Sequence, residues 1–522
     1  MIDLKPQADI LIKSLKMQTP FADRLHTNYV PLDPEIKQIH RIISRPLEEI
    51  SRLDGKIAYL QSMLDDLHGE RDLLSIFVDA HRALLSGIRR LPRELLQEIF
   101  TYCLPSSRRA SSSIISCEEA PILLGRICSS WRQIVMSTPQ LWSSIHVSLP
   151  GSTNRVRVLQ RVKAVERLLE LSGTCPLSIS FSCSGNSISA VEEAASSLFQ
   201  VLSPSSQRWE TLNLILPPFL FSKFFMTFTE ADFPLLNSIR LAPGLCMVRS
   251  GLLKSCGAMF RAPSLRSLSV SKLDISLSFA DCNHITDLNL DHMHALTTPE
   301  AIKILSSCPN LIFCRLKYLK ALGTRFSAIS LPFLRSLDIA GEPGDSETSD
   351  LTDFFDALIV PSLREFACNS YTRSGAGVPF KSMVSQSPVV ENIKLCLNSL
   401  STAAECLPLL PSLKQMSIYL PICREKPLGE CLLEDDLLRL LTPSLDSGEC
   451  LCPHLQEIKF YNWLAITDDA VRIFLMMRTS HPTVARLKNA TFTFCRPQTS
   501  NIMPELELLD GLSVDIRYYT FD

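Results

Sequence analysis

The residues of this sequence best suited to metal chemistry are one cysteine and three histidines in a short stretch, Cys282, His284, His292 and His294. Their spacing, C-x-H-x7-H-x-H, could supply four nitrogen and sulfur ligands of the kind that zinc takes in proteins. The stretch lies on a predicted strand and the turn after it, where successive side chains point to opposite faces, and no paired cysteines frame it. We therefore predict no metal site and no cofactor.

Catalytic and nucleotide-binding patterns are absent from the sequence. It has neither of the glycine-rich phosphate-binding patterns, G-x-x-x-x-G-K-[ST] and G-x-G-x-x-G, nor the nucleophile elbow G-x-S-x-G, nor the zinc-protease pattern H-E-x-x-H. Without such a pattern, the sequence does not identify a nucleophile and its base. We predict that the chain is not an enzyme.

Composition narrows the class of protein. The chain has 522 residues, of which 46% are hydrophobic, and its 52 basic and 54 acidic residues give a net charge of −2. A protein that binds nucleic acid is expected to carry a basic excess, so nucleic acid is not the predicted partner. No run of 18 apolar residues occurs and the N-terminus is charged, so we expect no membrane span and no signal peptide. The 18 cysteines are scattered without a C-x-x-C pair, which indicates reduced, buried thiols in a cytoplasmic or nuclear protein, not a secreted one.

A long helix is predicted near the N-terminus. Residues 1–32 contain Pro6, Pro20 and Pro31 and read as a flexible arm, whereas Asp33-Pro34-Glu35 has the residues of a helix start, with Asp33 as the N-cap. Over 33–88, apolar residues recur at alternating steps of three and four, as in the a/d seam of a coiled coil. The seam comprises Ile36, Ile39, Ile43, Ile50, Leu53, Ile57, Leu60, Leu64, Leu67, Leu74, Val78, Leu85 and Ile88.

This seam has two interpretations. It could dimerise the protein as a coiled coil, or it could pack against the rest of the same chain. Pro46, which is expected to kink the helix, and the polar residues Arg71 and His81 on the seam weaken the first interpretation. Both stay open at this point.

Two apolar helices follow at 89–145. The first starts at Leu91-Pro92, with Leu95, Leu96, Ile99 and Phe100 on one face. A serine-rich loop at 106–119 separates it from a second helix that begins near Ala120 and ends before Pro139. About 45 residues in short helices bury too little surface to be very stable alone, so an apolar patch would be left for a partner.

These two helices resemble an F-box. LPRELLQEIF matches its first helix, and LLGRICSSWRQIVMSTPQLWSSI matches its Cys-x-x-Trp-Arg and Pro-x-Leu-Trp ending. The helix before them resembles the N-terminal arm of the large F-box family of mushroom-forming fungi. The resemblance implies docking to the Skp adaptor of a cullin ubiquitin ligase. The adaptor-binding residues that it implies are Leu91, Pro92, Glu94, Leu95, Leu96, Ile99, Phe100, Leu123, Cys128 and Trp131. Trp131 and Trp142 are also candidates for the core, where large aromatic residues usually lie.

A repeated phrase, P-x-L-x-x-L-x-L, dominates the rest of the sequence. It begins at Pro234, Pro263, Pro309, Pro332, Pro361, Pro388, Pro411 and Pro453, with weaker copies at Trp209 and Ile285. Most spacings fall within the period of about 20–29 residues of a leucine-rich repeat, and the last, of 42, is expected to hide an irregular copy. We predict an irregular leucine-rich-repeat solenoid at 206–522, with 146–205 as a linking segment of helix and strand that caps it.

The residues between the repeat leucines are expected to line a concave sheet. Arg266, Arg335, Arg364 and Lys414 share one repeat position and could form a basic ladder for an acidic or phosphorylated target. The alternative is that they are ordinary solvated charges, as most exposed charged residues are. Over all the exposed positions of the predicted strands, eight residues are positive and six are negative, which does not define a basic face.

Together these patterns predict an α/β protein with a long helix, a three-helix F-box and a repeat domain. The predicted function is substrate recognition in a Skp- and cullin-containing ubiquitin ligase, in which the repeats hold a target protein near the ubiquitin-conjugating enzyme. The alternative is a scaffold protein, dimerised by its coiled coil, that binds a partner through its repeats without ubiquitin transfer.

Overall fold

A computed structural model describes most of the chain, namely residues 19–25, 27–105, 117–149, 155–183, 188–227, 233–243, 257–260, 262–271, 282–322, 325–341, 350–369, 378–396, 404–420, 434–444, 449–463 and 466–519. It divides into two compact units, Met1–Leu95 and Leu96–Asp522. The boundary falls inside a helix, later than the boundary predicted at residue 88. The predicted serine-rich loop lies mostly outside the described residues.

The first unit is dominated by the predicted long helix, α2 (Asp33–Leu84). Its N-cap is Leu32 and not Asp33 as predicted, and the Glu35 carboxylate accepts the Leu32 N–H at 2.8 Å. The same carboxylate pairs with Arg24 at 2.9 Å and accepts the Tyr29 hydroxyl at 2.8 Å. The described end of the predicted flexible arm, which includes the 3-10 turn η1 (Ala22–Arg24), is therefore hydrogen-bonded to the helix start.

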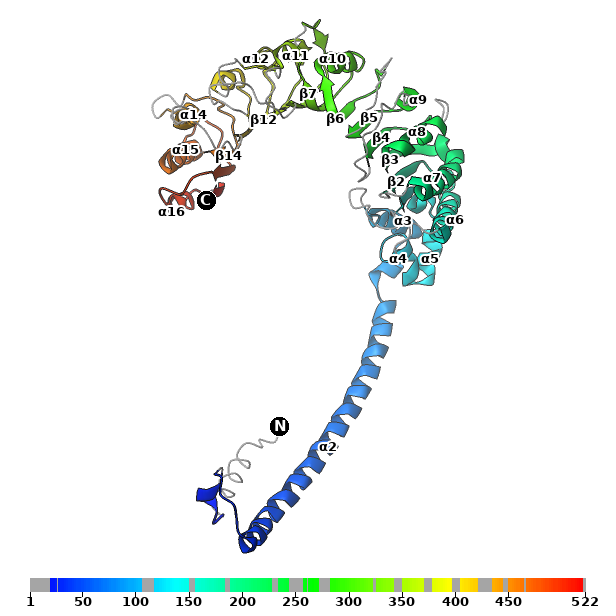
Figure 1. Cartoon of the computed structure of the whole chain (residues 1–522), viewed down its shortest axis with the longest axis vertical. Coiled ribbons are helices and arrows are strands. Elements are labelled where there is room, and N and C mark those ends of the chain that lie inside the picture. The colour runs from blue at the N-terminus through cyan, green and yellow to red at the C-terminus, as the bar shows by residue number, and fades with distance from the viewer. Residues whose placement is uncertain are drawn as a thin grey trace. The chain divides into compact units, whose positions relative to one another are not determined.

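Helix α2 has no buried residue along its 52 positions. It runs without interruption through Pro46 and is drawn as one curved helix (Figure 1). It ends at Leu84, so the last two residues of the predicted seam lie beyond it. Leu85 is the C-cap residue, and Ile88 belongs to the short 3-10 segment η2 (Gly87–Arg90).

The second unit begins with a cluster of short helices that leads directly into a sheet. The cluster consists of most of α3 (Arg93–Tyr102), α4 (Ile122–Ile127), α5 (Ser129–Met136) and the 3-10 turn η4 (Pro139–Trp142). The first strand starts at Ser144, two residues after η4. The single second helix predicted from Ala120 is two helices, α4 and α5, which meet at Cys128. The cluster therefore has three helices and is continuous with the sheet.

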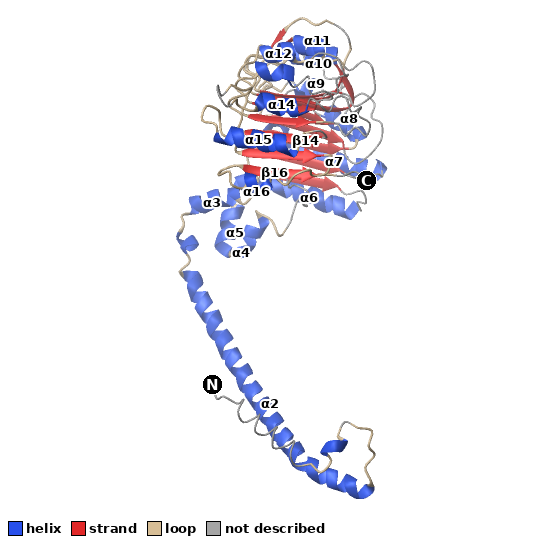
Figure 2. Cartoon of the chain, turned by 90° about the vertical axis from the view of Figure 1, so that its left-hand side faces the viewer, coloured by secondary structure: helices blue, strands red, loops and turns tan. Residues whose placement is uncertain are grey.

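Fourteen strands of the described residues form one sheet in which every neighbouring pair is parallel and the strands follow in chain order. Figure 2 shows them lying side by side across the unit. In sheet order they are β1 (Ser144–Leu149), β2 (Leu177–Cys183), β3 (Trp209–Leu216), β4 (Ser238–Pro243), β5 (Ser267–Ser271), β6 (Asp287–Thr297), β7 (Phe313–Lys320), β9 (Ser336–Gly341), β11 (Glu365–Asn369), β12 (Asn392–Cys396), β13 (Gln415–Tyr419), β14 (Glu457–Trp463), β15 (Asn489–Phe494) and β16 (Ser513–Tyr518). The short strands β8 (Ile329–Ser330) and β10 (Leu358–Ile359) pair separately.

The repeated phrase explains where these strands begin. Each of the eight prolines stands four residues before a strand, as Pro263 does before β5, in a turn that a proline tolerates because it needs no donor N–H. Within β5, Leu268 and Val270 are fully buried, while the serines between them are half-buried. Apolar residues therefore fill one side of the sheet, and polar residues occupy the other.

The helices of the second unit lie on the outer side of an arc, and the strands lie on its inner side (Figure 1). This arrangement accounts for the burial pattern, because the leucines point toward the helices. The helical segments between strands are α6 (Arg155–Leu171), α7 (Ile188–Leu202), η5 (Ser203–Arg208), α8 (Pro218–Thr227), α9 (Gly257–Phe260), α10 (Thr298–Ser306), α11 (Thr352–Asp356), α12 (Lys381–Ser385), η7 (Leu407–Leu409), α14 (Glu434–Leu441), α15 (Asp468–Ser480) and α16 (Met503–Leu506).

The segment 146–205 contains both helix and strand, and it supplies most of β1 and all of β2. One prediction about the repeats needs correction. The interval of 42 residues after Pro411 hides no further strand of the sheet, because β13 pairs directly with β14. The interval of 46 residues does contain the weaker copy at Ile285, which precedes β6, as predicted.

Candidate functional sites: a helical cluster and the inner face of the sheet

The helical cluster is held together by a few specific contacts. The rings of Phe100 and Trp131 lie 4.8 Å apart, which joins α3 to α5. The Gln97 amide donates to the Thr138 hydroxyl at 2.9 Å, and the Trp142 indole donates to the Val135 carbonyl at 2.9 Å. These contacts fix α3 against α5 and the turn that follows it.

Apolar residues remain exposed on both helices. On α3, Leu95 and Ile99 are one turn apart and 51% and 40% exposed, respectively. On α4, Leu123 and Ile127 are likewise one turn apart and are 42% and 57% exposed. Residues at this spacing share a helix face, so each helix carries an exposed apolar stripe on the side next to its buried residues. We refer to Leu95, Ile99, Leu123 and Ile127 as the exposed stripes.

The structure places the ten predicted adaptor-binding residues in different surroundings. Pro92, Glu94, Leu95, Ile99, Leu123 and Cys128 are exposed. Leu91 and Trp131 are partly buried, and Leu96 and Phe100 are buried in the cluster, so these last two support the exposed residues and do not themselves present a surface. Leu91, Pro92, Glu94 and Leu95 belong to the first unit, and the other six belong to the second. Trp142 is buried, as expected of a core residue.

The thiol of Cys128 has a local structural role. It accepts the backbone N–H of Trp131 at 3.4 Å and so caps the first turn of α5. The Arg132 guanidinium donates to the Gly125 carbonyl at 2.9 Å and ties α5 back to α4. The Cys-x-x-Trp-Arg sequence therefore builds the α4–α5 corner, which lies next to α3 in both cartoon views (Figures 1 and 2).

The inner face of the sheet is the second candidate site. The register aligns one residue of each strand into a central row that runs from His146 in β1 to Asp515 in β16. The row contains His146, Ser180, Asn213, Arg240, Ser269, Asn289, Arg315, Asp338, Ala367, Lys394, Ser417, Lys459, Thr491 and Asp515. It is a mixed polar surface of the kind that binds other proteins through particular side chains and not through overall charge.

The predicted basic ladder is not continuous. Arg266, Arg335, Arg364 and Lys414 do occupy one position, each immediately before its strand, at the edge of the inner face. Backbone hydrogen bonds show that Thr286 and Ile312 stand between Arg266 and Arg335. Glu391 stands between Arg364 and Lys414, and its carboxylate lies 3.6 Å and 3.1 Å from their nitrogens.

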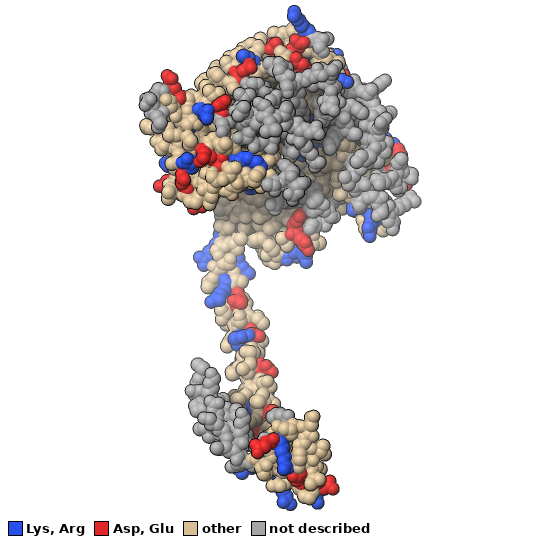
Figure 3. Space-filling model, turned by 60° about the vertical axis from the view of Figure 1, so that its left-hand side comes forward, with Lys and Arg blue, Asp and Glu red and all other residues tan. Residues whose placement is uncertain are grey.

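Other charges on the inner face are also balanced. Arg315 pairs with Asp338 at 2.6 Å, and Lys459 pairs with Glu457 at 2.5 Å. Basic and acidic residues are interspersed on the side of the second unit that Figure 3 shows. The described residues therefore do not form a single basic band of the kind that tracks a nucleic-acid backbone.

Sequence reasoning missed an aromatic pair on the inner face. Tyr419 of β13 and Tyr461 of β14 are register partners, and their rings stack with centroids 4.5 Å apart and planes 8° from parallel. Tyr419 is 38% exposed, and partial burial and the neighbouring Tyr461 raise the pKa of its hydroxyl. Exposed tyrosines held rigid in this way are frequent anchors in protein interfaces.

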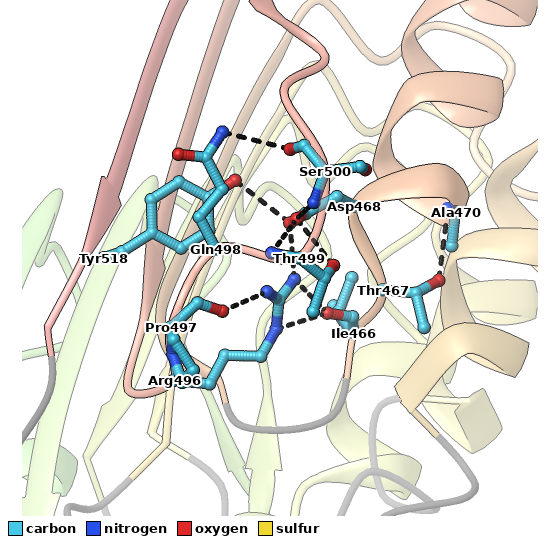
Figure 4. A network of polar contacts seen from close by, with 10 residues as sticks. All are labelled: Ile466, Thr467, Asp468, Ala470, Arg496, Pro497, Gln498, Thr499, Ser500 and Tyr518. Atoms are coloured by element: carbon cyan, nitrogen blue, oxygen red, sulfur yellow. Dashed lines mark hydrogen bonds and ion pairs between the residues drawn. The ribbon is translucent and has the colours of Figure 1, made fainter.

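A polar network fixes the C-terminal end of the sheet (Figure 4). The buried Asp468 carboxylate at the start of α15 pairs with Arg496 at 2.6 Å and accepts the Thr499 and Ser500 N–H groups at 2.8 Å each. It also accepts the Tyr518 hydroxyl at 2.9 Å. Burial alone would raise the pKa of Asp468, but these partners favour its charged form and hold the pKa well below its usual range. Every oxygen is engaged, so the network is a structural clamp and not an open site.

The histidine and cysteine cluster does not form a metal site within the described part of the chain. Cys282 is fully buried, and the side chains of His292 and His294 lie outside the described residues. No group of three potential metal ligands is found among the residues that the structure describes. Burial also raises the pKa of the Cys314 and Cys406 thiols to about 12, as expected of core residues. Cys103, Cys117 and Cys128 are exposed, so the prediction of buried thiols does not hold for every cysteine.

Comparison with known proteins yields no relative. No protein-family model matches the chain, and no curated protein matches it. Among the described residues, no helix combines the length and the apolar character needed to cross a membrane.

Proposed function

We propose that this protein is a substrate-recognition subunit of a cullin ubiquitin ligase. In this proposal, α3 and α4 dock a Skp-type adaptor, and the inner face of the sheet binds a target protein. The observation that carries the proposal is the pair of exposed stripes on helices that start at a Leu-Pro and end in the Cys-x-x-Trp-Arg and Pro-x-Leu-Trp sequences of an F-box. The chain would act by holding the target near the ligase, in the cytoplasm or nucleus, and would carry no catalytic residue.

The repeat architecture supports the second half of the proposal. We propose that the second unit is an irregular leucine-rich-repeat solenoid, because its strands are parallel, follow in chain order and repeat the same buried leucine positions. Solenoids of this kind bind partners through their extended inner face. We expect the Tyr419–Tyr461 pair to be a principal target contact, because it is the stacked aromatic pair found on that face among the described residues.

The docking half is tested by mixing the full chain with a purified Skp-type adaptor and measuring complex formation by size-exclusion chromatography and titration calorimetry. The double variant Leu95→Asp/Ile99→Asp places charge on the α3 stripe. We expect it to weaken binding by a factor on the order of 100, since each interface anchor lost contributes about 1.4 kcal/mol or more.

A matched control separates docking from folding. Leu159→Asp changes a leucine of α6 that is 55% exposed, outside the F-box-like segment, and should leave adaptor binding unchanged. Tryptophan fluorescence should report the same unfolding midpoint for all three proteins. If the folded wild type does not bind the adaptor, the ligase proposal is wrong.

One observation favours a second candidate function, a scaffold without ubiquitin transfer. Helix α2 buries none of its apolar residues, and a chain that dimerises through it could join two partners by its repeats. A dimer that binds no adaptor would support this candidate.

A further inference from the structure

An apolar seven-residue repeat runs along α2 and is interrupted at Pro46, Arg71 and His81. With Ile36 at position a, the a residues are Ile36, Ile43, Ile50, Ile57, Leu64, Arg71 and Val78, and the d residues are Ile39, Pro46, Leu53, Leu60, Leu67, Leu74 and His81. Isoleucine or valine thus occupies five of the seven a positions, and leucine occupies four of the seven d positions. This distribution favours a parallel coiled coil of two strands.

No described residue of the same chain covers this seam. Helix α2 has no buried residue, and in its middle Leu60 and Leu67 are 61% and 62% exposed. An apolar seam of this length in water is a binding surface. We infer that a second copy of the chain covers it, so that two α2 helices form a parallel, in-register coiled coil. This inference goes beyond the proposed function and does not depend on adaptor docking.

The polar residue on the seam supports the parallel register. In a parallel pair, an a side chain enters a hole whose wall includes the preceding g residue of the other helix. The a residue Arg71 therefore meets Glu70 of the second copy, and the symmetric pair forms as well. Within one chain, Arg71 contacts the adjacent Asp72 at 2.6 Å, and both side chains are more than 60% exposed, so this local pair holds Arg71 only weakly.

The remaining charges give each register one repulsive contact. In the parallel pair, Glu49 approaches Asp54 of the second copy, and in an antiparallel pair with full overlap Glu49 would approach Glu70. In both registers Glu49 is paired with Arg52 of its own helix. The choice of the parallel arrangement therefore rests on the contact of Arg71 with Glu70 and on the isoleucines at a and leucines at d.

The first test is the mass of the full chain in solution, measured by light scattering and sedimentation. We expect twice the chain mass of 58.4 kDa. The variant Leu60→Asp/Leu67→Asp should have half the wild-type mass. Tyr59 is 66% exposed at position c, so the control Tyr59→Asp should remain a dimer. Circular dichroism confirms that each variant retains the folded second unit.

The second test addresses the register. Arg71→Glu should weaken the dimer at least tenfold, because it places two glutamates at each a–g contact, and Glu70→Arg/Arg71→Glu should restore wild-type affinity by exchanging the charges. A monomeric, folded wild type would overturn the inference. A dimer that the charge exchange does not restore would overturn the parallel register.

Discussion

Helix α2 and the sheet of the second unit contain the same apolar side chains but place them in opposite environments. In the sheet, the repeat leucines such as Leu268, Leu290 and Leu316 are fully buried by neighbouring strands and helices of the same chain. In α2, leucines and isoleucines at an equally regular spacing are all at least partly exposed. The apolar residues whose burial drives folding are therefore those of the sheet, whereas the apolar residues of α2 stay at the surface of the described chain.

This difference shows that periodicity alone does not tell whether an apolar row is core or interface. A repeat of strands stacks on itself, because each new strand covers the edge of the one before. A single helix has no copy of itself within the described chain. Substitutions in the two regions test how far the burial of apolar side chains differs between them.

The largest effect is expected from the same substitution made in the two regions. Phe366 of β11 is 1% exposed and packs 5.0 Å from the ring of Phe380, so Phe366→Ala should destabilise the second unit by about 4 kcal/mol. Phe77 of α2 is 61% exposed, and Phe77→Ala should leave that unit's stability unchanged. All four tryptophans lie in the second unit, so denaturant unfolding followed by fluorescence reports on it alone. Equal losses in both variants would contradict the contrast.

A smaller effect is expected at the Asp468 clamp, which closes the C-terminal end of the sheet. Asp468→Asn removes the charge but keeps the size, and leaves Arg496 without its partner, so it should cost about 3 kcal/mol at neutral pH. The comparison variant Thr467→Ala removes the N-cap of α15 at the exposed residue next to Asp468. It should lower the free energy of unfolding by only about 1 kcal/mol.

The pH dependence of this clamp has a definite sign. The pKa of Asp468 is lowered in the folded state, so its stabilisation is fully present above the ordinary value of 3.8 and is lost as the pH falls through the lower folded value. The difference in unfolding midpoint between wild type and Asp468→Asn should be constant above pH 3.8 and should shrink below it. A difference that grows with acidification would show that the carboxyl is protonated in the native protein.

The sequence predicted the ten repeat strands from β3 to β14 because their signal is local. A proline and three leucines within eight residues determine where a turn ends and which side chains are buried. The two strands at each end of the sheet, β1, β2, β15 and β16, were missed because they lack this phrase, although alternation such as Ile145, Val147 and Leu149 was present. The long helix was predicted by periodicity, and its end was misplaced by a few residues.

The inner face of the sheet was less predictable than its strands, because its surface depends on which strands are neighbours. Arg364, Glu391 and Lys414 share one repeat position, the third residue after a proline, so the sequence already places Glu391 between the two cations. Its contacts with both depend on the pairing of β11, β12 and β13. Tyr419 and Tyr461 are 42 residues apart in the sequence, and only direct pairing of β13 with β14 brings their rings together. Contacts of this kind are properties of the register.

The smallest effect is expected at the Arg364–Glu391–Lys414 group, and it bears on what the edge of the inner face can bind. Glu391→Gln removes the carboxylate that lies near both cations, whose side chains are 60% and 48% exposed. Exposed pairs contribute little, so the variant should lose at most about 1 kcal/mol, and less at high salt. The variant is more informative about binding. Without the Glu391 carboxylate, Arg364 and Lys414 form one basic patch at the edge of the inner face. A phosphorylated or acidic peptide should therefore bind the variant more tightly than the wild type in a fluorescence titration. If binding is unchanged while stability is also unchanged, these residues are solvated charges, and the contacts that select a target lie elsewhere on the inner face, beginning with the stacked tyrosines.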